Sequence, residues 1–179
     1  EIGVRLVGSE MCIRDSFKIA MNALEYGRLT VSARSVGLAQ ACFEHSISYA
    51  NERIIRGKPI GHYQMIQHLI ADMAVNIDAA RLLVERTGSF MDQGKKSSRA
   101  TSRAKYVAVN AAKHAAASAA EIFAGYALAD EYPIKKFTAY VNMLAVGEGT
   151  PNVQRVLIAE DALGIKDANR HPIRNRLRK

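Results

Sequence analysis

The segment Gly147-Glu148-Gly149 holds the residues best suited to chemistry, because it sets one carboxylate between two glycines. Thr150 is a natural helix N-cap and Pro151 suits the first helical position, so a helix should begin directly after this segment. The backbone N–H groups of a helix start favour anions and polar acceptors. The pattern predicts that the Glu148 carboxylate faces a ligand from a loop whose two flanking residues have no side chains. The alternative is a simple turn in which the Glu148 side chain is solvated.

Apolar residues recur at helical spacing along most of the chain. The pattern predicts helices over 17–55, 62–91, 99–129, 134–144 and 151–164. The third is rich in alanine, which favours helix and lets neighbouring helices approach closely, so we expect it at the centre. Gly57 is expected to cap the first helix. Short connections and no expected strand predict an all-α fold, an antiparallel four-helix bundle with an extra short helix and a C-terminal helix.

The composition fits one folded domain, with 49% hydrophobic and 23% charged residues in a chain of 179. The net charge is +8, and five of the positive charges lie in the last ten residues. They are Arg170, Arg174, Arg176, Arg178 and Lys179. The rest is only weakly basic, so we expect no nucleic-acid partner. The tail should be solvated, or else contact the phosphates of a nucleotide-like ligand. No apolar run is long enough to predict a membrane span.

The two cysteines, Cys12 and Cys42, form no CxxC motif, and no Cys/His cluster has the spacing of a metal site. Cys42 should be a small core residue. The Glu-x-x-His pairs of a carboxylate-bridged metal bundle are also missing from the sequence, so we expect no metal.

The N-terminal residues 1–16 differ in character from the rest of the chain. Residues 7–16, Val-Gly-Ser-Glu-Met-Cys-Ile-Arg-Asp-Ser, look like a translated sequencing-library linker. We interpret 1–16 as a non-native segment and leave it out of the fold prediction. A targeting peptide fits poorly, because the segment is acidic at three positions and has no sustained apolar core.

Three motifs carry a resemblance to a known family. They are Phe17-Lys18-Ile19-Ala20-Met21 with Gly27-Arg28, then Tyr49 to Met73 with Gly57-Lys58-Pro59-Ile60 and Gln64, and then Gly147 to Arg155. In this order and spacing they resemble the C-terminal helical domain of the acyl-CoA dehydrogenases. The resemblance implies a domain over 17–164 and a basic tail over 165–179. It also implies that the N-terminal helical domain and the middle β domain of the family are missing.

The resemblance implies roles for several residues at one end of the domain. Glu148 would be the base that removes the α-proton of an acyl-CoA thioester, and Gly149 would lie against the substrate. Arg28 would support the substrate end of the pocket, and Glu25 is the fallback base. Some family members carry the base at the position of Gly27, which has no carboxylate here and therefore favours Glu148.

The same resemblance implies FAD as cofactor and assigns six residues to it. They are Thr150 and Asn152 near the ribityl and phosphate groups, Arg53 and Gln64 from a neighbouring subunit, and Glu121 and Gly125 at the adenine end. The implied activity is α,β-desaturation of an acyl-CoA, with hydride transfer to FAD. The implied partners are the acyl-CoA substrate, an electron-transfer flavoprotein and further copies of the chain in a dimer or tetramer.

Several departures from the family pattern qualify these expectations. Arg56 replaces a Phe, and the run Ala139-Tyr140-Val141-Asn142 replaces Arg-Asp-Ala-Lys. Ala124 and Ala127 replace glycines of the family pattern, and their extra bulk argues against the FAD contacts expected at the adenine end. Gly147 replaces an aromatic residue and suggests a roomier pocket. These departures leave open the alternative of a non-catalytic helical oligomerisation or binding module. The compartment would be the cytoplasm in a bacterium and the mitochondrial matrix in a eukaryote.

Overall fold

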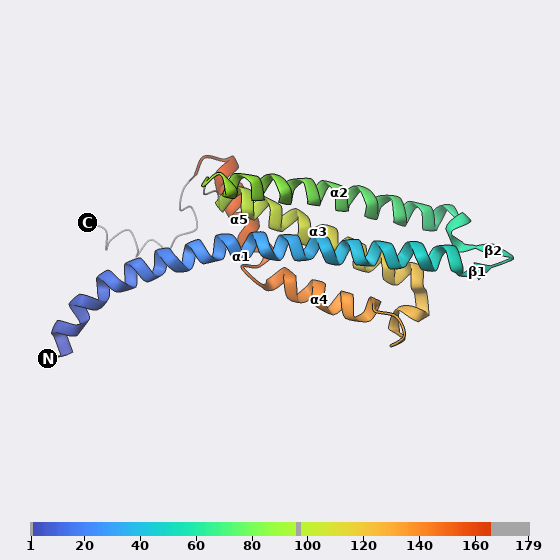
Figure 1. Ribbon diagram of the computed structural model, residues 1–179, viewed down its shortest axis with the longest axis horizontal. Helices are drawn as coiled ribbons and strands as arrows, with labels where there is room; N and C mark the ends of the chain where they lie inside the picture. The colour runs from blue at the N-terminus through green and yellow to red at the C-terminus, as the bar shows by residue number, and fades with distance from the viewer. Residues whose placement is uncertain (1, 96–97, 166–179) are drawn as a thin grey trace.

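The computed structural model describes residues 2–95 and 98–165, with side chains from Ile19 onward (Figure 1). The interpretation of residues 1–16 concerns side chains outside this part, and the basic charges of the tail lie outside it too. The elements are α1 (Ile2–Glu52), β1 (Ile54–Ile55), β2 (Lys58–Pro59), η1 (Ile60–His62), α2 (Gln64–Asp92), α3 (Ser98–Phe123), η2 (Ala124–Leu128), α4 (Ile134–Val146) and α5 (Pro151–Ala162). The predicted all-α fold is confirmed.

The alanine-rich helix α3 is the centre of the fold, as predicted. It packs against α1, α2, α4 and α5. Figure 1 shows α1 and α3 running in one direction and α2 and α4 running in the other. Five alanines of α3 are at most 1% exposed: Ala104, Ala108, Ala112, Ala115 and Ala119. Their small side chains allow the helix axes to approach closely, since interaxial distance follows the side chains at the contact.

The core continues from this alanine face to the other helices. Met73 and Ile77 of α2 lie in the same hydrophobic cluster as Cys42 of α1, and all three are at most 2% exposed. The interpretation of Cys42 as a core residue is confirmed, and burial raises the pKa of its thiol to about 12. None of the described helices combines the length and the apolar composition of a membrane span.

The end of α1 differs from the prediction. The helix stops at Glu52, and the chain turns through a two-stranded antiparallel hairpin with register Ile55 to Lys58. Arg56 and Gly57 form its two-residue turn with φ of 51° and 80°. Two positive φ angles are the signature of a type I′ turn. Gly57 therefore closes a hairpin, and its predicted role as a helix cap is wrong.

The end of α3 also differs. The expected helix over 99–129 gives way to a 3₁₀ turn at Ala124, whose φ is 49°. This left-handed conformation suits glycine, and it strains an alanine. The change of helix type lies beside the hairpin (Figure 1), whereas the Gly147–Gly149 segment follows the far end of α4.

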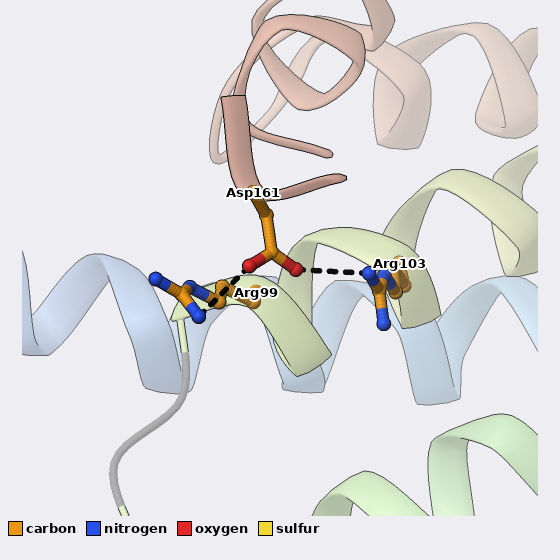
Figure 2. A network of polar contacts seen from close by, with 3 residues as sticks. All are labelled: Arg99, Arg103 and Asp161. Carbon is orange, nitrogen blue, oxygen red and sulfur yellow. Dashed lines mark hydrogen bonds and ion pairs between the residues drawn. The ribbon is translucent and has the colours of Figure 1, made fainter. Parts of the chain in front are cut away.

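Helix α5 is tied to the start of α3 by one carboxylate. Asp161 pairs with Arg99 and with Arg103, each at 2.8 Å (Figure 2). Its side chain is 13% exposed, whereas those of the two arginines are 62% and 50% exposed. Pairs this exposed contribute about 1 kcal/mol or less each. Their main consequence is geometric, because they hold α5, and with it the preceding loop, against α3.

Candidate active site

Glu148 lies in the loop between α4 and α5, half-buried, with its carboxyl against the backbone of α1. A Cβ added at Gly27 would lie 2.5 Å from Glu148 Cδ and 2.6 Å and 2.9 Å from its two carboxylate oxygens. Only a residue without a side chain leaves room for this contact. The carboxylate is therefore packed against a helix, which is not the solvated turn of the alternative interpretation.

Arg28 is the next residue of α1 and is 4% exposed. Its Nη2 donates a hydrogen bond to Ser98 Oγ at 3.0 Å, and its Nε is buried without a hydrogen-bond partner. Burial lowers the pKa of Arg28, while the charges of Glu25 and Glu148 act in the opposite direction. The structure thus brings together Glu148, Glu25 and Arg28, which the family motifs assign to the substrate end.

The backbone of the loop is unusual at two consecutive residues. Glu148 has a φ of 55° and Gly149 a φ of 98°. A left-handed Glu costs about 1–2 kcal/mol, so the surrounding contacts must compensate. At Gly149 a Cβ would lie 2.8 Å from Gln154 Nε2. A side chain at position 149 is therefore disfavoured both by this contact and by the positive φ. Both residues place the Glu148 side chain on the α1 side of the loop.

Two buried side chains hold this loop, and neither was assigned a role from the sequence. Lys105 of α3 donates from Nζ to the carbonyl oxygens of Gly147 and Gly149. Gln154 of α5 donates from Nε2 to the carbonyl oxygens of Glu148 at 3.4 Å and Gly149 at 3.2 Å. One signal could have revealed Lys105: it stands in the buried stripe of α3, four residues from Thr101 and from Val109.

Thr150 and Asn152 lie at the same end, at the start of α5. Thr150 is the N-cap by position, with extended φ and ψ of −61° and 162°, but its side chain makes no capping hydrogen bond. Asn152 accepts a hydrogen bond at Oδ1 from Arg155 Nη1 at 2.8 Å. Both residues are exposed beside the helix start, where free backbone N–H groups favour an anionic ligand.

A second feature lies at the hairpin end. A pocket of about 500 Å³ is lined by Arg53, Gly125 and aromatic residues that include Tyr49 and Tyr126. The Arg53 guanidinium stands 5.5 Å from the centre of the Tyr126 ring. A cation beside aromatic rings suits a planar anionic ligand such as a nucleotide.

The remaining expected FAD residues are not in this pocket. Gln64, at the start of α2, and Glu121, near the end of α3, are exposed and do not line it. Ala124 lines it. Ala127 is 5% exposed, belongs to the core and does not line the pocket.

The two features are far apart. Arg28 lies near Glu148, and Glu52 is the last residue of α1, next to Arg53. The stretch of helix from Arg28 to Glu52 spans about 36 Å, at 1.5 Å per residue. The group around Glu148 and the pocket around Arg53 therefore cannot both touch one small substrate. Among the described residues no cluster of His, Cys, Asp and Glu could hold a metal ion.

The fold and the two features define an all-α domain with one acidic site and one nucleotide-sized pocket at opposite ends. The family model described as "Acyl-CoA dehydrogenase, C-terminal domain" matches residues 15–163. The chain therefore belongs to the acyl-CoA dehydrogenase family. Members of this family are FAD-dependent oxidoreductases.

Individual relatives agree with this assignment. The glutaryl-CoA dehydrogenase of Desulfococcus multivorans is 40% identical over 157 residues, which are 87% of this chain and 40% of that protein. The CarC subunit of the caffeyl-CoA reductase–Etf complex of Acetobacterium woodii is 36% identical over 82% of this chain and 39% of its own length. A glutaryl-CoA dehydrogenase solved with glutaryl-CoA superposes with a TM-score of 0.81 at 39% identity, over 86% of this chain and 39% of that one. The chain spans about 40% of the length of the curated relatives it matches.

The contact with Gly27 predicts a contrast between two substitutions on α1. Gly27→Ala should displace the Glu148 carboxyl, because the new Cβ would overlap it. Gly37→Ala is the matched control, since a Cβ there meets nothing within 4 Å. The control should stabilise the fold by about 0.5–1 kcal/mol through helix propensity, and Gly27→Ala should lack this gain. Urea unfolding measures the difference, and equal stabilisation by both alanines would contradict the contact.

Proposed function

We propose that this chain is the C-terminal domain of an FAD-dependent acyl-CoA dehydrogenase, in which Glu148 is the base that removes the α-proton of an acyl-CoA thioester. The observation that carries this proposal is the Glu148 carboxyl packed on Gly27 next to the buried Arg28. Gly27 matches the position from which other members of the family present their base. A carboxylate that reaches the same point from the opposite loop can serve the same reaction.

The chain's own residues supply the proton-transfer half of the reaction. The α-C–H of a thioester is a weak acid, so the base must be held close and aligned. The fixed loop meets this requirement at Glu148, and Gly149, with no side chain, lets the substrate approach the backbone. Arg28 supports the substrate end, where its buried Nε has no protein partner. Glu25 is the less favoured base, because it shares α1 with Arg28 and lies outside the loop that the buried side chains fix.

The residues present fit FAD at both ends of the domain. FAD, when bound, supplies the acceptor for the β-hydride of the substrate. Thr150 and Asn152 would hold its ribityl and phosphate region near Glu148. Arg53 and Gly125 line a pocket whose cation and aromatic rings suit an adenine nucleotide. Gln64 and Glu121 would act from the surface around that pocket.

The distance between the two ends favours an oligomer. Because α1 separates them by about 36 Å, the Arg53 end would serve the FAD of a neighbouring copy while Glu148 serves its own. We therefore propose a homodimer or homotetramer. An electron-transfer flavoprotein is the proposed redox partner, which agrees with the Etf complex named for the CarC relative. The names of the relatives include dehydrogenases and reductases, so the chemistry is proposed without a direction.

The base role predicts a large loss of activity in Glu148→Gln. A suitable enzyme is a chimera in which residues 17–165 replace the matching domain of the Desulfococcus multivorans glutaryl-CoA dehydrogenase. Its turnover of glutaryl-CoA with an artificial electron acceptor should fall about 10²–10⁴-fold, because general-base catalysis is worth that much. Glu25→Gln is the matched control and should lose less than about tenfold.

The outcome separates the two functions considered. Equal activity of Glu148→Gln and the unsubstituted chimera would remove Glu148 as the base and favour the non-catalytic module.

We also expect the 179-residue chain alone to turn over little or no acyl-CoA, because the β domain of the family contributes to the flavin site. Clear turnover by the purified chain would contradict that expectation.

The pocket at the hairpin end predicts a loss of flavin in Arg53→Met. In the same chimera, this variant should retain about tenfold less FAD after gel filtration, since it lacks the guanidinium beside the Tyr126 ring. Arg56→Met is the matched control, because Arg56 is exposed at the hairpin tip and does not line the pocket. Flavin absorbance measures the retained cofactor. Equal retention by both variants would exclude Arg53 from the FAD site.

A further inference from the structure

Lys105 is among the largest fully buried side chains of the described residues, with 1% of its surface exposed. Its neighbours in the buried stripe of α3 include Thr101 and Val109. The ammonium donates hydrogen bonds to the carbonyl oxygens of Gly147 and Gly149, the two residues that flank Glu148. An ammonium has three donors and no acceptor, so two of its three bonds go to this one loop.

The stability of the fold alone does not explain a lysine at this position. No carboxylate of the described residues forms an ion pair with it. Burial lowers the pKa of Lys105, with Arg28 acting in the same direction and Glu148 in the opposite one. An apolar side chain of similar volume would avoid the cost of burying a charge. The lysine must therefore serve the groups that it binds.

Those groups are peptide carbonyls that enclose the carboxylate. Positive φ angles at Glu148 and Gly149 fold the loop so that the carbonyls on either side of Glu148 converge on one ammonium. Gln154 bonds the Glu148 carbonyl, and its buried Oε1 has no partner. Every peptide carbonyl from 147 to 149 is thus held by a buried side chain of α3 or α5.

We propose that Lys105 is a positioning residue for the base, and that its ammonium locks the loop in the conformation that packs the Glu148 carboxyl on Gly27. The catalytic consequence rests on the proposed function, whereas the ordering of the loop does not. Without the ammonium, the carbonyl oxygens of Gly147 and Gly149 accept hydrogen bonds from water instead. The left-handed conformation of Glu148 is then no longer stabilised. The carboxylate then samples other directions, which lowers kcat and leaves substrate binding intact.

The first test measures loop order in the full 179-residue chain, without any catalytic assay. Hydrogen–deuterium exchange by mass spectrometry is compared between the unsubstituted chain and Lys105→Met, which keeps the length of the side chain and removes its donors. We expect exchange in the segment 143–154 to become about tenfold faster, with exchange in α1 and α2 unchanged. Lys113→Met is the matched control on α3, because Lys113 is exposed, and it should change neither region.

The second test uses the glutaryl-CoA dehydrogenase chimera. Lys105→Met should lower kcat about 10²-fold, the usual effect of a misplaced catalytic group, with KM changed less than about threefold. Lys113→Met should leave both constants unchanged. If Lys105→Met does not fold, Lys105→Gln is used for both measurements, because its amide keeps a polar group in the site but is too short to reach the carbonyls.

Two results would overturn the proposal. One is unchanged exchange in the segment 143–154, which would show that the loop is ordered without the ammonium. The other is faster exchange throughout α1, α2 and α3, which would make Lys105 a general support of the fold. The failure of the proposed function is separate: in that case Glu148→Gln keeps its activity, whatever Lys105→Met does to the exchange of the loop.

Discussion

The acidic site depends on one missing side chain. Because Gly27 has no Cβ, the carboxyl of Glu148 can lie directly on the backbone of α1, 2.5 Å from where that Cβ would be. The opposite side of the loop is fixed by Lys105 and Gln154, which reach it because α3 is lined by small residues and α5 is tied to α3 by Asp161. The direction of the Glu148 side chain is thus defined by the bare backbone at Gly27 on one side and by the hydrogen-bonded carbonyls of the loop on the other.

The sequence alone predicts the fold well, because periodic apolar patterns are local and α3 carries an unmistakable alanine face. It fails where the backbone takes positive φ at residues that rarely adopt it, as at Arg56 in the hairpin and Ala124 after α3. Glu148 and Arg28 could be paired through the family motifs. The buried stripe of α3 marks Lys105 as unusual, but the sequence does not indicate its partners, because they are main-chain carbonyls.

The described part of this acyl-CoA dehydrogenase family chain has two separated features. The acidic end and the Arg53 pocket lie at opposite ends of a rigid stretch of α1. The chain spans about 40% of the length of the relatives it matches. The same helix therefore fixes the distance between the carboxyl of Glu148 at one end and the pocket around Arg53 at the other.

The most direct test of this account is a transfer of the carboxylate from the loop to the helix, in the chimera with the double substitution Gly27→Glu and Glu148→Gly. Within a Glu side chain Cδ lies about 2.5 Å from Cβ, which matches the distance from the Gly27 Cβ position to Glu148 Cδ. We expect the double variant to turn over glutaryl-CoA at least about 10²-fold faster than Glu148→Gly alone. A double variant that is no faster than the single one would contradict the claim that the two positions present a carboxylate to the same point.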